Sequence, residues 1–212
     1  RPRKRPVTRL PLPLPPPVSK PQPRNNSAVS VRDMQRIDET AIQALGIPRL
    51  LLMDAAGRAT ANAVKTLLPH PAGVLVCCGL GYNGGDGLCA AWYLSRWAYQ
   101  PLVVLAGERS RLKDEPAIFA GILEHQGMHI EELTDESQLD RLQEPAARTS
   151  AVVDALLGIG LSGPVRPLQA RVIEWMNQLG KPIVSADVPS GLDADRGVPM
   201  PVAIRARLTV TF

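Results

Sequence analysis

The sequence contains little cysteine. Only Cys77, Cys78 and Cys89 occur among its 212 residues. Their number is odd, two of them are adjacent in one apolar stretch, and no secretory signal precedes them. We therefore expect free, buried thiols in a reducing compartment, the cytoplasm, rather than a disulfide framework.

The usual zinc ligands are also scarce. No C-x-x-C spacing occurs, and the three histidines are scattered at His70, His125 and His129. This argues against a zinc site of the common Cys/His type. No apolar run approaches the roughly 18 residues of a membrane helix, so we expect no membrane partner.

Basic charge is concentrated at the beginning of the chain. The net charge is +4, but residues 1–28 hold seven Lys and Arg residues and no acid. Of the 24 basic residues, 17 therefore remain against 20 acidic ones, which makes residues 29–212 mildly acidic. This argues against a nucleic-acid partner for the folded domain.

Residues 1–28 also differ from the rest in proline content. Nine prolines occur in the first 23 residues, and there is no initiator Met. Such a segment forms neither a helix nor a core, so we expect a disordered basic tail. A tail that targets the protein or docks an acidic partner is the alternative. The folded domain is then expected over residues 29–212.

Two helices are expected before the first strand. Ser30 can cap the first helix, which would end at Gly46. Its apolar residues follow helical spacing at Met34, Ile37, Ala41, Ile42 and Leu45. The second runs from about residue 49 to 67. A face suited to close packing is predicted at Leu52, Ala55, Ala56, Ala59 and Ala63.

Strand and helix patterns alternate in the remaining sequence. Apolar runs predict strands at 74–78, 101–106, 128–132, 151–153, 182–186 and 207–212. Helices are predicted at 86–97, 113–126, 136–143 and 167–179. This alternation predicts an α/β fold with parallel strands and helices on both faces of the sheet. Because the last run is apolar up to Phe212, we expect more chain to follow in the natural protein.

Polar, glycine-rich residues follow three of the predicted strands. The segments are Gly79-Leu80-Gly81-Tyr82-Asn83-Gly84-Gly85-Asp86-Gly87, Val153-Asp154-Ala155-Leu156-Leu157-Gly158-Ile159-Gly160 and Ala186-Asp187-Val188-Pro189-Ser190-Gly191-Leu192-Asp193. The C-terminal ends of parallel strands meet along one crevice, where ligands bind. We therefore expect one composite site.

The first segment fits several interpretations. Gly79-x-Gly81-x-x-Gly84 matches the dinucleotide fingerprint, with Glu108 as its ribose acid. However, Asp86 at the predicted helix start would repel a pyrophosphate and is more easily explained as an N-cap. A tight turn that needs positive φ would explain the glycines but not Asn83 and Asp86 together. We favour a specialised ligand loop.

Two aspartates follow the other strands, Asp154 and Asp187. A carboxylate in that position costs free energy unless it is paired, protonated or bound to a cation. For Asp154 alone, capping of the next turn is the simpler explanation. Together with the Asn83 amide and the Ser190 hydroxyl, the two carboxylates could form an oxygen cage for a hard cation or supply an acid and a base.

In this order, N-G-G-D-G, V-D-A-L-L-G-x-G-L and D-V-P-S-G-L-D resemble the YjeF N-terminal family over about residues 31–212. Its enzymatic members are the NAD(P)H-hydrate epimerases. The resemblance implies a Rossmann-like three-layer αβα sandwich with a mostly parallel sheet. The implied activity interconverts the R and S epimers of hydrated NADH and NADPH (NAD(P)HX). The implied partners are a second copy in a homodimer and a fused or separate dehydratase that uses ADP or ATP.

The resemblance also assigns residues. Asn83, Asp154 and Ser190 would ligate a potassium ion, K⁺. Asp154 would also be the catalytic carboxylate, because the ring hydroxyl leaves and returns through a cation-like intermediate that a negative charge stabilises. The substrate would contact Tyr82, Asn83, Gly84, Gly85, Asp86, Gly158, Ile159, Gly160, Leu161, Ser162, Gly163, Pro164 and Asp187.

The sequence departs from the family pattern at several positions. Tyr82 replaces an Asn, Ile159 replaces a Thr, and the P-K-P-G-L segment expected after Phe212 is absent. Two other functions remain open. One is a non-catalytic YjeF-type ligand-binding or scaffold domain, and the other is an ordinary NAD-dependent oxidoreductase. The polar residues at the strand ends favour the epimerase over both.

Overall fold

The structure is a computed structural model that describes residues 29–161 and 163–212. The predicted basic tail over residues 1–28 and the predicted substrate contact at Ser162 lie outside the described residues. Among the helices described, none is both long and apolar enough to cross a membrane.

A six-stranded sheet forms the centre of the molecule. Its strands are β1 (Gly73–Cys78), β2 (Gln100–Leu105), β3 (Ile130–Glu132), β4 (Ala151–Ala155), β5 (Ile183–Ala186) and β8 (Leu208–Val210). They lie in the order β3-β2-β1-β4-β5-β8, and every neighbouring pair is parallel. The strand order reverses between β1 and β4, which is where an open α/β sheet forms its ligand crevice.

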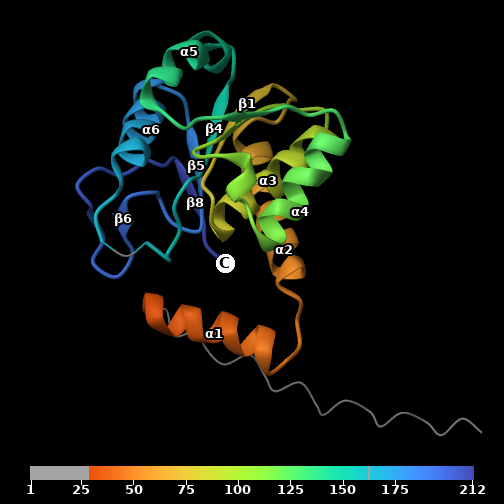
Figure 1. The fold of residues 1–212 in the computed structure, drawn as a ribbon, viewed down its shortest axis with the longest axis vertical. Helices are drawn as coiled ribbons and strands as arrows, with labels where there is room; N and C mark the ends of the chain where they lie inside the picture. Colours follow the sequence, from red (N-terminus) through yellow and green to blue (C-terminus); the bar gives the residue numbers. More distant parts are fainter. Residues whose placement is uncertain (1–28, 162) are drawn as a thin grey trace, which may run out of the picture.

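Helices cover both faces of this sheet (Figure 1). One face carries α2 (Arg49–Leu67), α3 (Tyr82–Arg96) and α4 (Asp114–His125), and the other carries α5 (Leu139–Ala147) and α6 (Pro167–Gln178). Alternate residues of β1 divide between the two cores: Val74 and Val76 pack toward α2–α4, whereas Leu75 and Cys77 pack toward α5 and α6. The predicted three-layer αβα sandwich is confirmed.

The start of α3 differs from the prediction. The helix begins at Tyr82 rather than residue 86, and Gly81 occupies the N-cap position without a side-chain hydrogen bond. Asp86 therefore lies in the second turn and is not the predicted N-cap. The sequence pattern did not indicate this start, because glycine is a poor helix former and Gly84 and Gly85 both lie in the first turns of the helix.

The buried face of α2 is rotated from the predicted one. Ala55 is exposed, and of the five predicted positions only Ala56 is fully buried. The buried residues are Met53, Ala56, Gly57, Thr60, Ala61 and Val64. A Cβ added to Gly57 would lie 2.4 Å from the Cβ of Cys89 on α3, so glycine allows the two helices to approach closely.

Helix α1 (Val31–Gln43) is capped by Ser30 as predicted, since the Ser30 side chain accepts a hydrogen bond from the Asp33 N–H. The apolar residues that follow helical spacing do not enter the core. None of its residues is buried, and Ile37 is 52% exposed. The helix lies opposite the C-terminal ends of the strands, near the chain's C-terminus (Figure 1).

Three short elements were not anticipated. β6 (Leu192–Asp193) and β7 (Val198–Pro199) form a small antiparallel pair, and η1 (Arg109–Arg111) is a 3₁₀ turn after β2. The predicted helix at 136–143 is divided into the 3₁₀ turn η2 (Glu136–Gln138) and α5. In the connection between β6 and β7, Asp195 accepts a hydrogen bond of 2.8 Å from the Val31 N–H and so links this region to α1.

Candidate functional site

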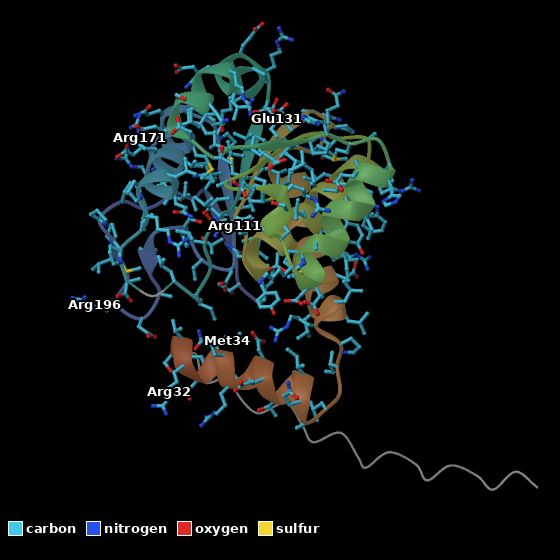
Figure 2. All side chains as sticks on the ribbon, in the orientation of Figure 1. Arg32, Met34, Arg111, Glu131, Arg171 and Arg196 are labelled. Carbon is cyan, nitrogen blue, oxygen red and sulfur yellow. The ribbon has the colours of Figure 1, made fainter. Side chains whose placement is uncertain are left out.

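A cavity of about 840 Å³ lies at the C-terminal ends of β1, β4 and β5. Its wall is formed by the loop and helix start after β1, the loop after β4, Asp187 after β5, one side of α1, and Phe212. Figure 2 shows Met34 on the side of α1 that faces the rest of the molecule. The volume is typical of a small-molecule site, and the position is the switch point of the sheet.

The structure brings together most of the predicted substrate contacts. The predicted residues that line the cavity are Tyr82, Asn83, Asp86, Gly158, Ile159, Gly160, Leu161, Pro164 and Asp187. Gly84, Gly85 and Gly163 do not line it, nor do Asp154 and Ser190. The three polar strand ends therefore form one site, with Asp154 and Ser190 behind its wall.

The glycines after β1 permit close backbone packing. A Cβ on Gly79 would lie 2.0 Å from the Leu156 carbonyl oxygen, and one on Gly84 would lie 1.8 Å from the Gly79 carbonyl oxygen. None of the glycines from Gly79 to Gly87 has positive φ, so the tight-turn explanation based on positive φ is wrong. Gly81 and Gly160 differ from these, since a Cβ there would meet no protein atom within 4 Å. Both line the cavity and leave it open.

Asp154 is completely buried and fully hydrogen-bonded. Its carboxylate accepts hydrogen bonds from the Ser185 hydroxyl at 2.7 Å and the Ser190 N–H at 2.9 Å. The Leu156 N–H donates at 3.3 Å, and the Ser190 hydroxyl also donates. Burial raises the pKa of Asp154, and these hydrogen bonds oppose the rise. Asp154 therefore ties the end of β4 to the segment after β5.

Ser190 links this buried carboxylate to the cavity wall. While its hydroxyl donates to Asp154, its oxygen accepts a hydrogen bond of 2.8 Å from the Leu157 N–H. Leu157 itself lines the cavity. Asp154 is thus linked to the cavity wall through Ser190, and also directly through the N–H of Leu156, which lines the cavity as well.

Asn83 is the least satisfied polar side chain of the site. Both atoms of its amide are buried, and neither has a hydrogen-bond partner among the described residues. A Cβ on Gly158 would lie 3.3 Å from the Asn83 Cγ and 2.5 Å from the Asp187 Oδ2, so Asn83 and Asp187 flank Gly158. A buried amide without a protein partner is rare, and this one is free to bind a ligand, an ion or an ordered water.

Asp187 has an unusual backbone conformation. Its φ is +66°, in the left-handed region that non-glycine residues seldom occupy. Its carboxylate accepts a hydrogen bond of 2.7 Å from the Ile159 N–H. Burial raises the pKa of Asp187, and the Ile159 hydrogen bond opposes the rise. Such strain commonly occurs at functional sites, and here it holds the carboxylate at the cavity.

Asp86 lines the same cavity from the second turn of α3. Burial, followed by the charges of Asp187 and Asp38, raises the pKa of Asp86 to about 8. Asp86 and Asp187 therefore have different environments, because in the described part of the chain only Asp187 accepts a hydrogen bond that favours its charged form. Two carboxyl groups whose surroundings shift their pKa values to different extents can act as an acid and a base.

Several cavity residues were not identified from the sequence. Arg49, Arg111 and Arg166 line the cavity, and α1 adds Met34, Gln35, Asp38 and Glu39. The guanidinium of Arg49 lies 4.3 Å from the centroid of the Tyr82 ring. The pattern around Met34, Gln35 and Asp38 looks like the opening helix of the family but does not by itself indicate a site. No motif marks the three arginines, which lie outside the three polar segments in sequence.

The predicted K⁺ ligands can be examined against this geometry. No group of three His, Cys, Asp or Glu residues suited to a metal ion occurs within residues 29–161 and 163–212. The predicted set has a different composition, one amide, one carboxylate and one hydroxyl. Of the predicted set, the Asn83 amide lines the cavity without a partner among the described residues, whereas Asp154 and Ser190 are hydrogen-bonded to each other and do not line it. All three carry the oxygen atoms that a hard cation prefers, and the K⁺ site stays a prediction.

Comparisons with known proteins show the family to which the chain is related. The family described as YjeF-related protein N-terminus matches residues 49–212. The chain is 35% identical over 188 residues to the "Bifunctional NAD(P)H-hydrate repair enzyme Nnr" of Thermofilum pendens, which covers 86% of this chain and 34% of that enzyme. It is 34% identical over 187 residues to the "NAD(P)H-hydrate epimerase" of Limosilactobacillus fermentum, covering 87% and 85%.

A solved structure shows the same fold. The crystal structure of the yeast protein YNL200c matches with a TM-score of 0.75 and 27% identity, covering 87% of this chain and 79% of that one. The chain spans about a third of the length of the bifunctional relatives that it matches, at 34% and 33%.

Proposed function

The chain belongs to the YjeF-related protein N-terminus family, and from this premise we propose that it is an NAD(P)H-hydrate epimerase, an isomerase of nicotinamide nucleotide repair. The observation that carries the proposal is the convergence of three strand-end segments on one cavity, where Asp86, Asp187 and the unsatisfied Asn83 amide meet. The relatives named as epimerases share this part of the chain.

The chemistry requires an acid and a base beside the hydrated ring carbon. When the ring hydroxyl takes up a proton, its C–O bond breaks and water leaves, with the positive charge shared by the ring nitrogen. Water then adds to the opposite face and gives up a proton. Asp86 and Asp187 line the cavity and can exchange these protons, and their negative charge stabilises the cationic ring.

Asp154 has a supporting place in this proposal. It does not line the cavity, but it is joined through Ser190 to the loop that does. Its role as the catalytic carboxylate stays a prediction. Asn83, Asp154 and Ser190 would hold the proposed K⁺, which when bound supplies a fixed positive charge for oxygen ligands at the strand ends. That charge would also satisfy the Asn83 amide oxygen.

The proposal includes partners and a compartment. A fused or separate dehydratase remains part of it, since several relatives are named as bifunctional repair enzymes. The homodimer stays a prediction that rests on the family resemblance alone. The cytoplasm is proposed as the compartment because the three cysteines are free and buried.

A coupled assay tests the activity. The isolated R epimer of NADHX is incubated with the protein and an S-specific dehydratase. The recovery of NADH is followed by the absorbance of its reduced nicotinamide ring. We expect recovery to be faster than with dehydratase alone. A rate equal to spontaneous epimerisation would contradict the proposal and favour a non-catalytic ligand-binding or scaffold domain.

A further inference from the structure

The cavity holds several charged side chains that are not paired with one another. Four are acidic (Asp38, Glu39, Asp86 and Asp187) and three are basic (Arg49, Arg111 and Arg166). In the described part of the chain, none of the seven forms an ion pair within 4 Å, whereas Arg109, two residues from Arg111, is paired with Glu124 at 2.8 Å. Opposite charges that share a cavity without pairing are available to a charged ligand.

The acidic residues form one group. Asp86 experiences the charges of both Asp187 and Asp38, and both raise its pKa. All three carboxyl groups line the same cavity, so this part of it is acidic and disfavours anions. It suits a ring that becomes positively charged and is unsuited to phosphate groups.

The arginines are in different positions. Arg111 belongs to η1 after β2, and Arg166 precedes α6 at its N-cap position after β4, so they lie on elements from the two sides of the strand-order reversal. Arg49 already contacts the Tyr82 ring. Arg111 and Arg166 are exposed, and Figure 2 shows Arg111 near the centre of the view. Guanidinium groups match phosphate oxygens in geometry and charge.

A third polar residue lies beside Arg166. Gln169 lines the cavity from the first turn of α6, and its Oε1 is buried without a donor among the described residues. A sugar hydroxyl is a donor that could satisfy this oxygen. A phosphate at Arg166 with an adjoining ribose would supply both partners.

We propose that Arg111 and Arg166 bind the phosphate groups of the dinucleotide and thereby place its reduced ring against the Asp38, Asp86 and Asp187 group. This inference rests on the proposed function, since it concerns the orientation of that substrate. Arg111 and Arg166 are positioning residues that act on binding. The chemical step belongs to the carboxyl groups.

The test separates binding from turnover. Arg111→Gln and Arg166→Gln are compared with Arg96→Gln, which alters an exposed arginine in the last turn of α3 that does not line the cavity. Isothermal titration with ADP-ribose, which contains the diphosphate but no nicotinamide ring, gives Kd. The epimerase assay with R-NADHX gives KM and kcat.

We expect each cavity variant to raise the Kd for ADP-ribose and the KM for R-NADHX roughly tenfold or more, because a charged hydrogen-bonding partner is lost. The kcat should stay within about threefold, since the carboxyl groups are unchanged. The increase in Kd on going from low to high salt should also be smaller in both variants than in Arg96→Gln.

Two results would separate a failure of the arginine inference from a failure of the proposed function. If R-NADHX is epimerised but both cavity variants match Arg96→Gln in Kd and KM, the inference about Arg111 and Arg166 is wrong. If no epimerisation occurs but ADP-ribose binds and the two variants weaken it, the proposed function is wrong while the phosphate contacts stand.

Discussion

At the scale of single residues, the site is defined by side chains whose surroundings do not satisfy them. Asp86 has a pKa raised to about 8, Asn83 has no hydrogen-bond partner in the described chain, and Asp187 has a φ of +66°. Each of these features costs folding free energy. A ligand or ion that relieves this cost when it binds should bind more tightly for that reason.

The raised pKa of Asp86 predicts a pH dependence of stability. Its folded-state pKa of about 8 exceeds the ordinary value of 3.8, so folding favours the protonated form. The stabilisation is complete below about pH 4 and is lost as the pH rises toward 8. In buffer without K⁺, Asp86→Asn should therefore melt a few degrees higher than the wild type at pH 8. Its melting temperature should also fall less than that of the wild type as the pH rises toward 8.

The control for that experiment is Asp140→Asn, which alters an exposed aspartate in the first turn of α5. Thermal melts between pH 5 and 8.5 provide the comparison. If Asp86→Asn follows the wild type at every pH, as Asp140→Asn should, the Asp86 carboxyl group is not destabilised by its surroundings.

The unsatisfied amide of Asn83 predicts how K⁺ acts. Because the buried amide makes no protein hydrogen bond and so costs folding free energy, Asn83→Ala should not lower the melting temperature in K⁺-free buffer and should raise it slightly. The wild type should become more stable as KCl replaces choline chloride at constant ionic strength, because an ion that binds only the folded state stabilises it. The variant should lose most of this gain. If KCl raises the melting temperature of both proteins equally, or of neither, Asn83 does not bind K⁺.

At the scale of helices and strands, the sequence was most informative where one short apolar run formed one buried strand. All six predicted strands of the main sheet were found. The inner strands β1, β4 and β5 are buried and therefore need continuous apolar residues, whereas the edge strands β3 and β8 are short and partly exposed. Helix faces and helix starts were less predictable. α3 begins among glycines, and the buried face of α2 includes a glycine and a threonine that no simple apolar pattern selects.

The contact between α2 and α3 gives a stability prediction. Gly57→Ala should destabilise the protein by about 1–3 kcal/mol, because the added methyl group would overlap Cys89. Gly121→Ala is the matched control, since a Cβ at that helical position in α4 meets no atom within 4 Å and alanine is the better helix former. Urea unfolding should therefore move in opposite directions for the two variants. If Gly57→Ala is neutral, the helices do not require this close approach.

At the scale of the whole molecule, the position of the candidate site could be predicted and its full composition could not. The three polar strand ends indicated one crevice, and the structure places a cavity there. The arginines carry no recognisable motif, and the α1 residues belong to a helix pattern that does not by itself indicate a site. Only the folded arrangement brings Arg111, Arg166 and Asp38 to one cavity.

The central claim is that this cavity interconverts the two epimers of a hydrated nicotinamide ring. The most direct measurement follows pure R-NADHX by chromatography that resolves both epimers, in water enriched in ¹⁸O and without any dehydratase. The account predicts that catalytic amounts of protein accelerate the approach to the same R/S equilibrium and that ¹⁸O enters the ring hydroxyl at the same accelerated rate. An R-to-S rate equal to that of the protein-free control, with no added ¹⁸O exchange, would contradict it.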